Sequence, residues 1–77
     1  MPNITVELLT GRTLEQKRAF VAAVTDAAVE TLKAKRESVR IRLDEIETWD
    51  VANGGKLESD VRGVDVPENV RVPAGAR

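Results

Sequence analysis

The chain opens with Met1-Pro2-Asn3-Ile4-Thr5-Val6-Glu7-Leu8-Leu9-Thr10-Gly11-Arg12-Thr13. Ile4, Val6 and Leu8 alternate with polar residues. A period of two residues with β-branched side chains predicts a strand from Asn3 to Leu9. The glycine that follows predicts a turn, and this turn brings an arginine to the start of the next element.

Pro2 gives this segment its chemical interest. Loss of the initiator Met1 would leave the Pro2 nitrogen as a free secondary amine, and the strand that follows would hold that amine in place. An amine at one end of the strand and the cation of Arg12 at the other end are the parts of a small acid–base site.

Residues 14–32 have the pattern of an amphipathic helix. Thr13 is the predicted N-cap, and Gln16 three residues later completes a capping box. No glycine or proline interrupts the segment. Apolar residues recur at three- and four-residue spacing on one face, namely Phe20, Val21, Val24, Ala28 and Leu32.

Residues 38–46 predict a second strand. Apolar Val39, Ile41 and Leu43 alternate there with charged Arg40, Arg42 and Asp44. A strand, a long helix and another strand form a βαβ unit, in which the two strands are parallel and the crossover is right-handed. The predicted class is therefore α+β, with one βαβ unit and a short C-terminal hairpin.

The C-terminal third is less regular. The segment Asn53-Gly54-Gly55 predicts the turn of that hairpin. Beyond Leu57 the valines are dispersed among glycines and prolines, so we expect an extended arm over 58–72 and disorder at the end. The predicted organisation is a βαβ domain over 1–59 and an arm or partly disordered tail over 60–77.

Composition excludes several classes of function. The 77 residues include no cysteine and no histidine, which removes disulfides, thiolate chemistry and the usual zinc ligands. The 12 basic and 13 acidic residues are interspersed, so no basic face for nucleic acid is expected. No apolar run approaches the ~18 residues of a membrane helix, and no signal peptide is recognisable. We expect a soluble cytoplasmic protein without cofactor or metal.

The predicted fold is too small to be stable alone. Two parallel strands and one helix leave one face and both edges of the sheet uncovered. A chain of this length also buries only about 60% of its unfolded surface. We therefore expect a homo-oligomer in which neighbouring subunits complete the sheet.

Pro2, Arg12 and Arg40 form the candidate catalytic set. Burial and nearby cations lower the pKa of an amine, and a base adjusted towards neutral pH can move a proton between oxygen and carbon. Arginine binds carboxylates bidentately and can stabilise an oxygen that gains negative charge. The set predicts a proton-shuttling site for a small keto or enol acid.

Each of these residues also has a purely structural interpretation. Arg12 could solvate the turn, and Arg40 and Arg42 could pair with Glu7 across the strands. Trp49 could serve packing alone, and the glycine pair after Asn53 could be only a turn.

Family resemblance favours the catalytic interpretation. Three features resemble the 4-oxalocrotonate tautomerase family: Pro2 with the segment from Leu8 to Lys17, Ser38-Val39-Arg40 at the second strand, and Gly54-Gly55 followed by Leu57. The similarity covers about residues 2–59 without a gap. It implies a βαβ fold and a hexamer built as a trimer of dimers. It also implies an amino-terminal proline that acts as general base, and a role in the degradation of aromatic compounds.

The resemblance also implies the roles of the site residues. Arg12 and Arg40 would contact substrate carboxylate and carbonyl groups, often from different subunits. Leu9, Trp49, Val51 and Asn53 are the predicted substrate-binding residues. Val51 stands where the family usually has an aromatic residue, and Trp49 would substitute for it. These departures concern the pocket and leave the base and the arginines in place.

Three functions follow from these observations. The first is a cofactor-independent tautomerase acting on a 2-hydroxymuconate-like acid. The second is a hydratase, dehalogenase or decarboxylase with the same site, in which Glu7 or Glu45 would activate water. The third is a non-catalytic structural subunit, which retention of Met1 would favour.

Overall fold

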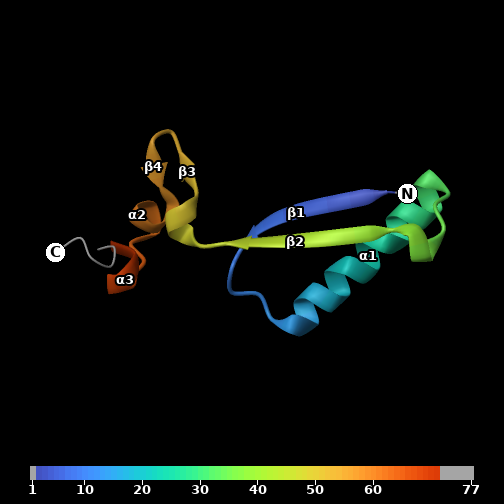
Figure 1. Ribbon diagram of the computed structural model, residues 1–77, viewed down its shortest axis with the longest axis horizontal. Helices are drawn as coiled ribbons and strands as arrows, with labels where there is room; N and C mark the ends of the chain where they lie inside the picture. Colours follow the sequence, from blue (N-terminus) through green and yellow to red (C-terminus); the bar gives the residue numbers. More distant parts are fainter. Residues whose placement is uncertain (1, 72–77) are drawn as a thin grey trace. The chain divides into compact units, whose positions relative to one another are not determined.

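Strand β1 (Asn3–Leu9), helix α1 (Leu14–Leu32) and strand β2 (Arg40–Ile46) follow one another in a computed structural model that describes residues 2–71. β1 and β2 run in the same direction side by side, with α1 as their crossover (Figure 1). The predicted βαβ unit is thereby confirmed. The chain divides into two units at Glu45–Ile46, and each is described by itself.

Helix α1 begins as its sequence predicts. The Thr13 side chain accepts a hydrogen bond from the Gln16 backbone at 3.1 Å, and the Gln16 side chain accepts one from the Thr13 backbone at 2.9 Å. The capping box is therefore present, and it satisfies two donors that the helix itself leaves unpaired. The helix ends at Leu32, after which Lys33 adopts a left-handed φ of 57°.

Strand β2 starts later than expected. Residues Arg36–Ser38 form a single 3-10 turn, closed by a hydrogen bond from the Ser38 N–H to the Lys35 carbonyl at 2.9 Å. The strand therefore begins at Arg40 instead of residue 38. The alternation that predicts the strand begins at Val39, so it does not show whether Ser38 belongs to the strand or to a preceding turn.

The second unit contains the predicted hairpin. A 3-10 turn, η2 (Thr48–Asp50), precedes β3 (Ala52–Asn53) and β4 (Lys56–Leu57). The two strands are antiparallel, with Ala52 opposite Leu57. Both glycines between them have positive φ, 62° at Gly54 and 82° at Gly55, which explains why the turn carries two glycines.

The expected extended arm is wrong. Residues Glu58–Arg62 form helix α2, and Glu68–Arg71 form helix α3 (Figure 1). An ion pair of 2.5 Å joins Arg62 to Glu58 along α2, and Gly63 ends this helix with a φ of 68°. These are local interactions that scattered valines do not signal. The expected disorder at the end concerns residues 72–77, which lie outside the described residues, and the proposed boundary at 59/60 stays a prediction.

Apolar burial in a single copy is slight. Among the described residues Ala28, 5% exposed, is the only buried hydrophobic side chain. Larger side chains of α1 remain exposed, with Leu14 at 61%, Phe20 at 42% and Leu32 at 65%. Within residues 2–71, no helix combines the length and the hydropathy needed to cross a membrane.

Candidate active site

Pro2 and Arg40 lie together where the two parallel strands begin. The backbone N–H of Arg40 donates to the carbonyl oxygen of Pro2 at 3.0 Å. Pro2 is half-buried and the Arg40 side chain is exposed. The parallel pairing of β1 with β2 therefore sets the position of the proline beside the arginine, although 37 residues lie between Pro2 and Arg40.

Arg12 lies beyond the opposite end of β1. Gly11, with a φ of 120°, turns the chain, and one Arg12 Nη donates to the Leu9 carbonyl at 3.2 Å. The interpretation of Arg12 as a residue that solvates the turn is thus partly right. Most of its five N–H donors are left for other partners.

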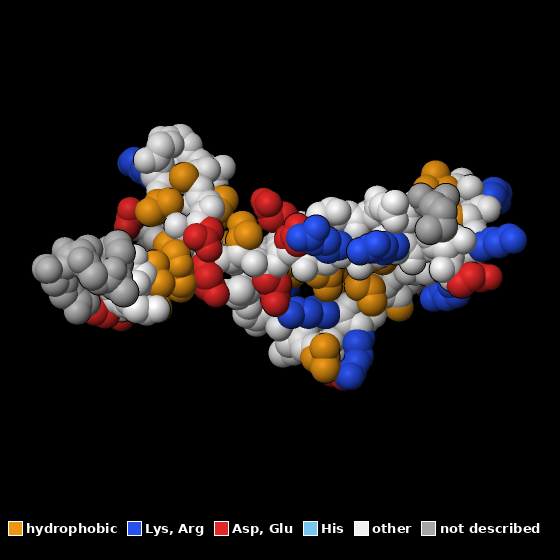
Figure 2. All heavy atoms as spheres, viewed as in Figure 1, with side chains coloured by type: hydrophobic (Ala, Val, Ile, Leu, Met, Phe, Trp, Pro, Cys, Tyr) orange, Lys and Arg blue, Asp and Glu red, His pale blue; other side chains and the backbone are white. Residues whose placement is uncertain are grey.

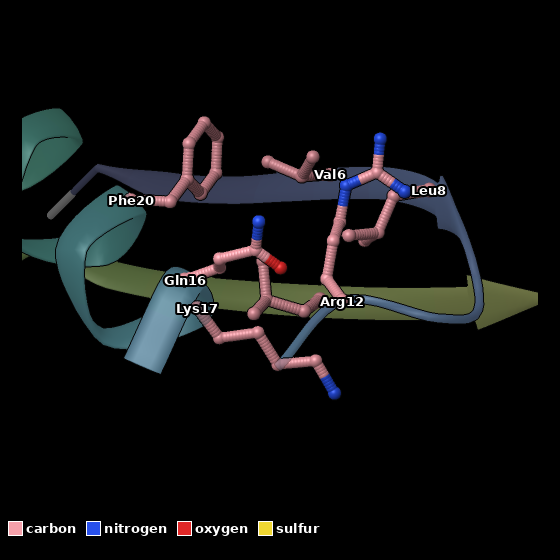
Figure 3. Close-up of a pocket in the computed structure, with 7 residues that line it drawn as sticks. Val6, Leu8, Arg12, Gln16, Lys17 and Phe20 are labelled. Carbon is pink, nitrogen blue, oxygen red and sulfur yellow. The ribbon is translucent and has the colours of Figure 1, made fainter. Parts of the chain in front are cut away.

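A hollow of about 210 Å³ lies beside Arg12, between the sheet and the first turns of α1. Figure 3 shows its lining from both elements, with Phe20 and Gln16 on the helix side and Val6 and Leu8 on the strand. The lining comprises Val6, Leu8, Arg12, Gln16, Lys17, Phe20 and Leu43. An apolar floor with cationic groups beside it suits the hydrocarbon part and one carboxylate of a small acid.

Lys17 is a site neighbour that the sequence reasoning missed. Its Nζ pairs with Glu45 Oε1 at 2.8 Å and so ties α1 to β2. Lys17 precedes Val21, Val24 and Ala28 at spacings of four, three and four residues, so it occupies the inward stripe of the helix. That spacing was the signal available in the sequence. The same ion pair engages Glu45, one of the two carboxylates considered for water activation.

The ion pair on the charged face of the sheet is not the cross-strand pair with Glu7 that the structural interpretation considered. Arg42 Nε donates to Asp44 Oδ1 at 2.8 Å, along the strand. Within residues 2–71 the structure shows no ion pair between Glu7 and either Arg40 or Arg42. A second hollow, of about 190 Å³, lies on this face and is lined by Asn3, Ile4, Thr5, Arg40 and Arg42.

The predicted substrate-binding residues are divided between the two units. Leu9 belongs to the first unit, where its carbonyl accepts from Arg12. Trp49, Val51 and Asn53 belong to the second, and there the Glu58 N–H donates to the Val51 carbonyl at 2.8 Å. Trp49 lines a third hollow, of about 470 Å³, whose other walls come from β4, α2 and the segment up to Arg71.

One chain does not bring the three candidate catalytic residues together. At ~3.3 Å per residue, β1 spans about 20 Å from Asn3 to Leu9. Pro2 and Arg40 precede this span and Arg12 follows it. A site that uses all three groups therefore requires at least two copies of the chain.

Comparison with known proteins identifies the family. The family model described as "Tautomerase enzyme" matches residues 2–60. A probable tautomerase of Listeria monocytogenes is 39% identical over 61 residues, covering 79% of this chain and all of the relative. The 2-hydroxymuconate tautomerase of Bacillus subtilis is 43% identical over 61 residues, covering 79% of this chain and 98% of the relative.

Solved structures agree with the sequence relatives. A 4-oxalocrotonate tautomerase isozyme from Methylibium petroleiphilum has a TM-score of 0.79 at 38% identity, covering 83% of this chain and all of that one. A heterohexamer 4-oxalocrotonate tautomerase from Chloroflexus aurantiacus has a TM-score of 0.75 at 26% identity, covering 80% of this chain and all of that one. The resemblance seen in the sequence is confirmed: the chain belongs to the tautomerase family and is an isomerase of the 4-oxalocrotonate tautomerase type.

Proposed function

We propose that this tautomerase interconverts the enol and keto forms of a small 2-hydroxymuconate-like acid, with Pro2 as the general base. The observation that carries the proposal is the 3.0 Å hydrogen bond that holds Pro2 beside Arg40. The name of the Bacillus subtilis relative supports the substrate class. The proposed base requires loss of Met1, because an acylated proline nitrogen has no basic lone pair.

The proposed reaction needs one proton carrier and two cations. The Pro2 nitrogen removes the proton from the 2-hydroxyl group, a C=O bond forms at that carbon, and the proton returns to carbon at the far end of the conjugated system. Arg40 stabilises the oxygen while it carries negative charge. Arg12 binds the distal carboxylate. Proton transfer by a positioned base contributes typically 10²- to 10⁴-fold in rate.

Assembly supplies the remaining geometry in this proposal. Arg12 comes from a different copy than Pro2, because one chain holds them at opposite ends of β1. We propose a homohexamer, a trimer of dimers, in which Leu9, Trp49, Val51 and Asn53 contact substrate. The exposed Leu14, Phe20 and Leu32 support assembly because their apolar surface lacks cover in a single copy.

Replacement of the proposed base tests the function. Ketonisation of 2-hydroxymuconate by the untagged protein should fall about 10²- to 10⁴-fold in kcat/KM on Pro2→Ala. Arg18→Ala is the control, since Arg18 pairs with Glu15 on the outer surface of α1. Equal rates for wild type and Pro2→Ala would overturn the assignment of Pro2.

The intact mass of the purified protein distinguishes an enzyme with a free Pro2 amine from a non-catalytic subunit. A mass short by one methionine supports a free Pro2 amine. A mass that includes Met1, together with absent ketonisation, would favour a non-catalytic structural subunit. Assembly from two kinds of chain occurs among the relatives, since the 4-oxalocrotonate tautomerase of Chloroflexus aurantiacus is a heterohexamer.

A further inference from the structure

The hollow on the charged face of the sheet contains a second cation that the proposed mechanism does not use. Arg40 and Arg42 both line this hollow, together with Asn3, Ile4 and Thr5. Its volume of about 190 Å³ is below the ~300 Å³ at which ligand pockets for whole small molecules begin. The hollow therefore suits one polar end of a substrate.

The two arginines differ in how they are held. The Arg42 Nε–H donates to Asp44, so one donor is engaged and the terminal nitrogens remain for another acceptor. Over the described residues, Arg40 makes no ion pair, and its backbone is tied to Pro2. Asp44 thus orients the guanidinium group of Arg42, whereas the guanidinium group of Arg40 is available to bind a ligand.

Both guanidinium groups can reach one end of a single ligand. Residues two apart on a strand lie on the same face at ~6.6 Å, and arginine side chains are longer than half of that separation. Figure 2 shows basic side chains gathered over β2 on the exposed face. Asn3 and Thr5, on the neighbouring strand, add polar groups to the same hollow.

We infer that Arg42 is a specificity-determining residue that binds the carboxylate next to the reacting oxygen, which leaves Arg40 free for that oxygen. The 2-hydroxy acid end of the substrate carries two neighbouring oxygen functions, a permanent carboxylate and an oxygen that becomes charged only during reaction. Two adjacent guanidinium groups match these two functions. This inference rests on the proposed function and deepens it.

The division of roles predicts opposite kinetic signatures. A carboxylate is charged in ground state and transition state alike, so loss of its partner raises KM and spares kcat. Arg42→Gln should raise KM about 10- to 100-fold, the range for a charge-assisted hydrogen bond. Arg40→Gln should lower kcat, because it removes a contact that strengthens in the transition state.

The choice of substrates tests which carboxylate is bound. Phenylenolpyruvate has a single carboxylate, located next to the hydroxyl group, whereas 2-hydroxymuconate has a second one at its far end. Equal KM increases for both substrates in Arg42→Gln support the inference. An increase only with 2-hydroxymuconate would place Arg42 at the distal carboxylate and overturn it, as would no increase.

A matched control separates this effect from loss of a surface ion pair. Arg36→Gln makes the same substitution in another exposed ion pair. Arg36 contacts Asp26 at 2.6 Å, and its side chain is 57% exposed, compared with 69% for the side chain of Arg42. The substitution should leave KM within about twofold, as expected for a surface pair. A comparable KM increase in Arg36→Gln would overturn the inference.

Binding provides a test that does not depend on turnover. Titration of phenylpyruvate into the native oligomer by calorimetry should show an affinity at least 10-fold lower for Arg42→Gln than for wild type or Arg36→Gln. A wild type that binds phenylpyruvate in this manner but ketonises neither substrate would contradict the proposed function and support the Arg42 inference. Equal affinity of the variants, or no binding by wild type, would overturn the inference.

Discussion

The two ends of strand β1 are organised by different kinds of interaction. At its beginning, Pro2 is held by a backbone hydrogen bond from Arg40. At its other end, Arg12 is positioned by the turn at Gly11 and by the capping box of α1. The first end depends on pairing between distant segments, and the second depends on residues close in sequence.

This difference shows how a short chain can supply a composite site. The proposed base and one arginine share the end set by strand pairing, while the other arginine sits about 20 Å away at the end set by the turn. In the proposed assembly, each copy contributes the proline end to one site and the turn end to another. Assembly then becomes a condition for the proposed chemistry.

Mixing two inactive variants tests this arrangement with the largest expected effect. Pro2→Ala should lose about 10²- to 10⁴-fold in kcat/KM, and Arg12→Ala at least about 10-fold. Unfolded together and refolded, they should recover about a quarter of the wild-type sites, because random assembly joins intact proline and turn ends from different copies. The ketonisation rate of the refolded mixture provides the measurement.

A second mixture serves as the control for that experiment. Pro2→Ala refolded with the double variant Pro2→Ala/Arg12→Ala has no intact proline end and should recover nothing. If the first mixture also recovers nothing while refolded wild type regains its activity, both ends act within one copy and the composite site is wrong.

The turn end can be weakened without touching the proline end. Thr13→Ala removes the acceptor for the Gln16 N–H and should lower stability by about 1 kcal/mol, typical of a lost N-cap. The melting temperature should fall by ~4–8 °C at a fixed protein concentration. Thr31→Ala is the matched control, since Thr31 bonds the Ala27 carbonyl inside the helix and alanine favours helix. Equal melting temperatures for Thr13→Ala and wild type would contradict the role of the cap.

The smallest expected effect concerns the link between α1 and β2. A double-mutant cycle with Lys17→Met and Glu45→Gln should give a coupling free energy of about 0.5–1 kcal/mol in urea unfolding, because both side chains are partly exposed. Ketonisation by Glu45→Gln should stay near the wild-type rate. Selective loss of ketonisation in Glu45→Gln, with folding intact, would contradict a purely structural role of Glu45.

The predictions from sequence were most accurate where a long periodic pattern or a capping motif marks the element. The alternation of Ile4, Val6 and Leu8 predicted β1, and Thr13 with Gln16 predicted the start of α1 to the residue. Reasoning from pattern failed at the start of β2 and after Leu57, where 3-10 and helical turns depend on bonds such as Arg62 to Glu58. Short turns of this kind leave no periodicity to detect.

The sequence by itself determined the βαβ order, the hairpin turn and the presence of a proline and two arginines at motif positions, since these depend on neighbouring residues and on chemical identity. Only the tertiary structure decided that Arg40 lies beside Pro2, that Lys17 joins Glu45, and that Arg42 pairs with Asp44 instead of Glu7. The physical reason is that these contacts link separate elements or select one among several possible charge partners. Strand pairing and the direction of each side chain decide which residues become partners.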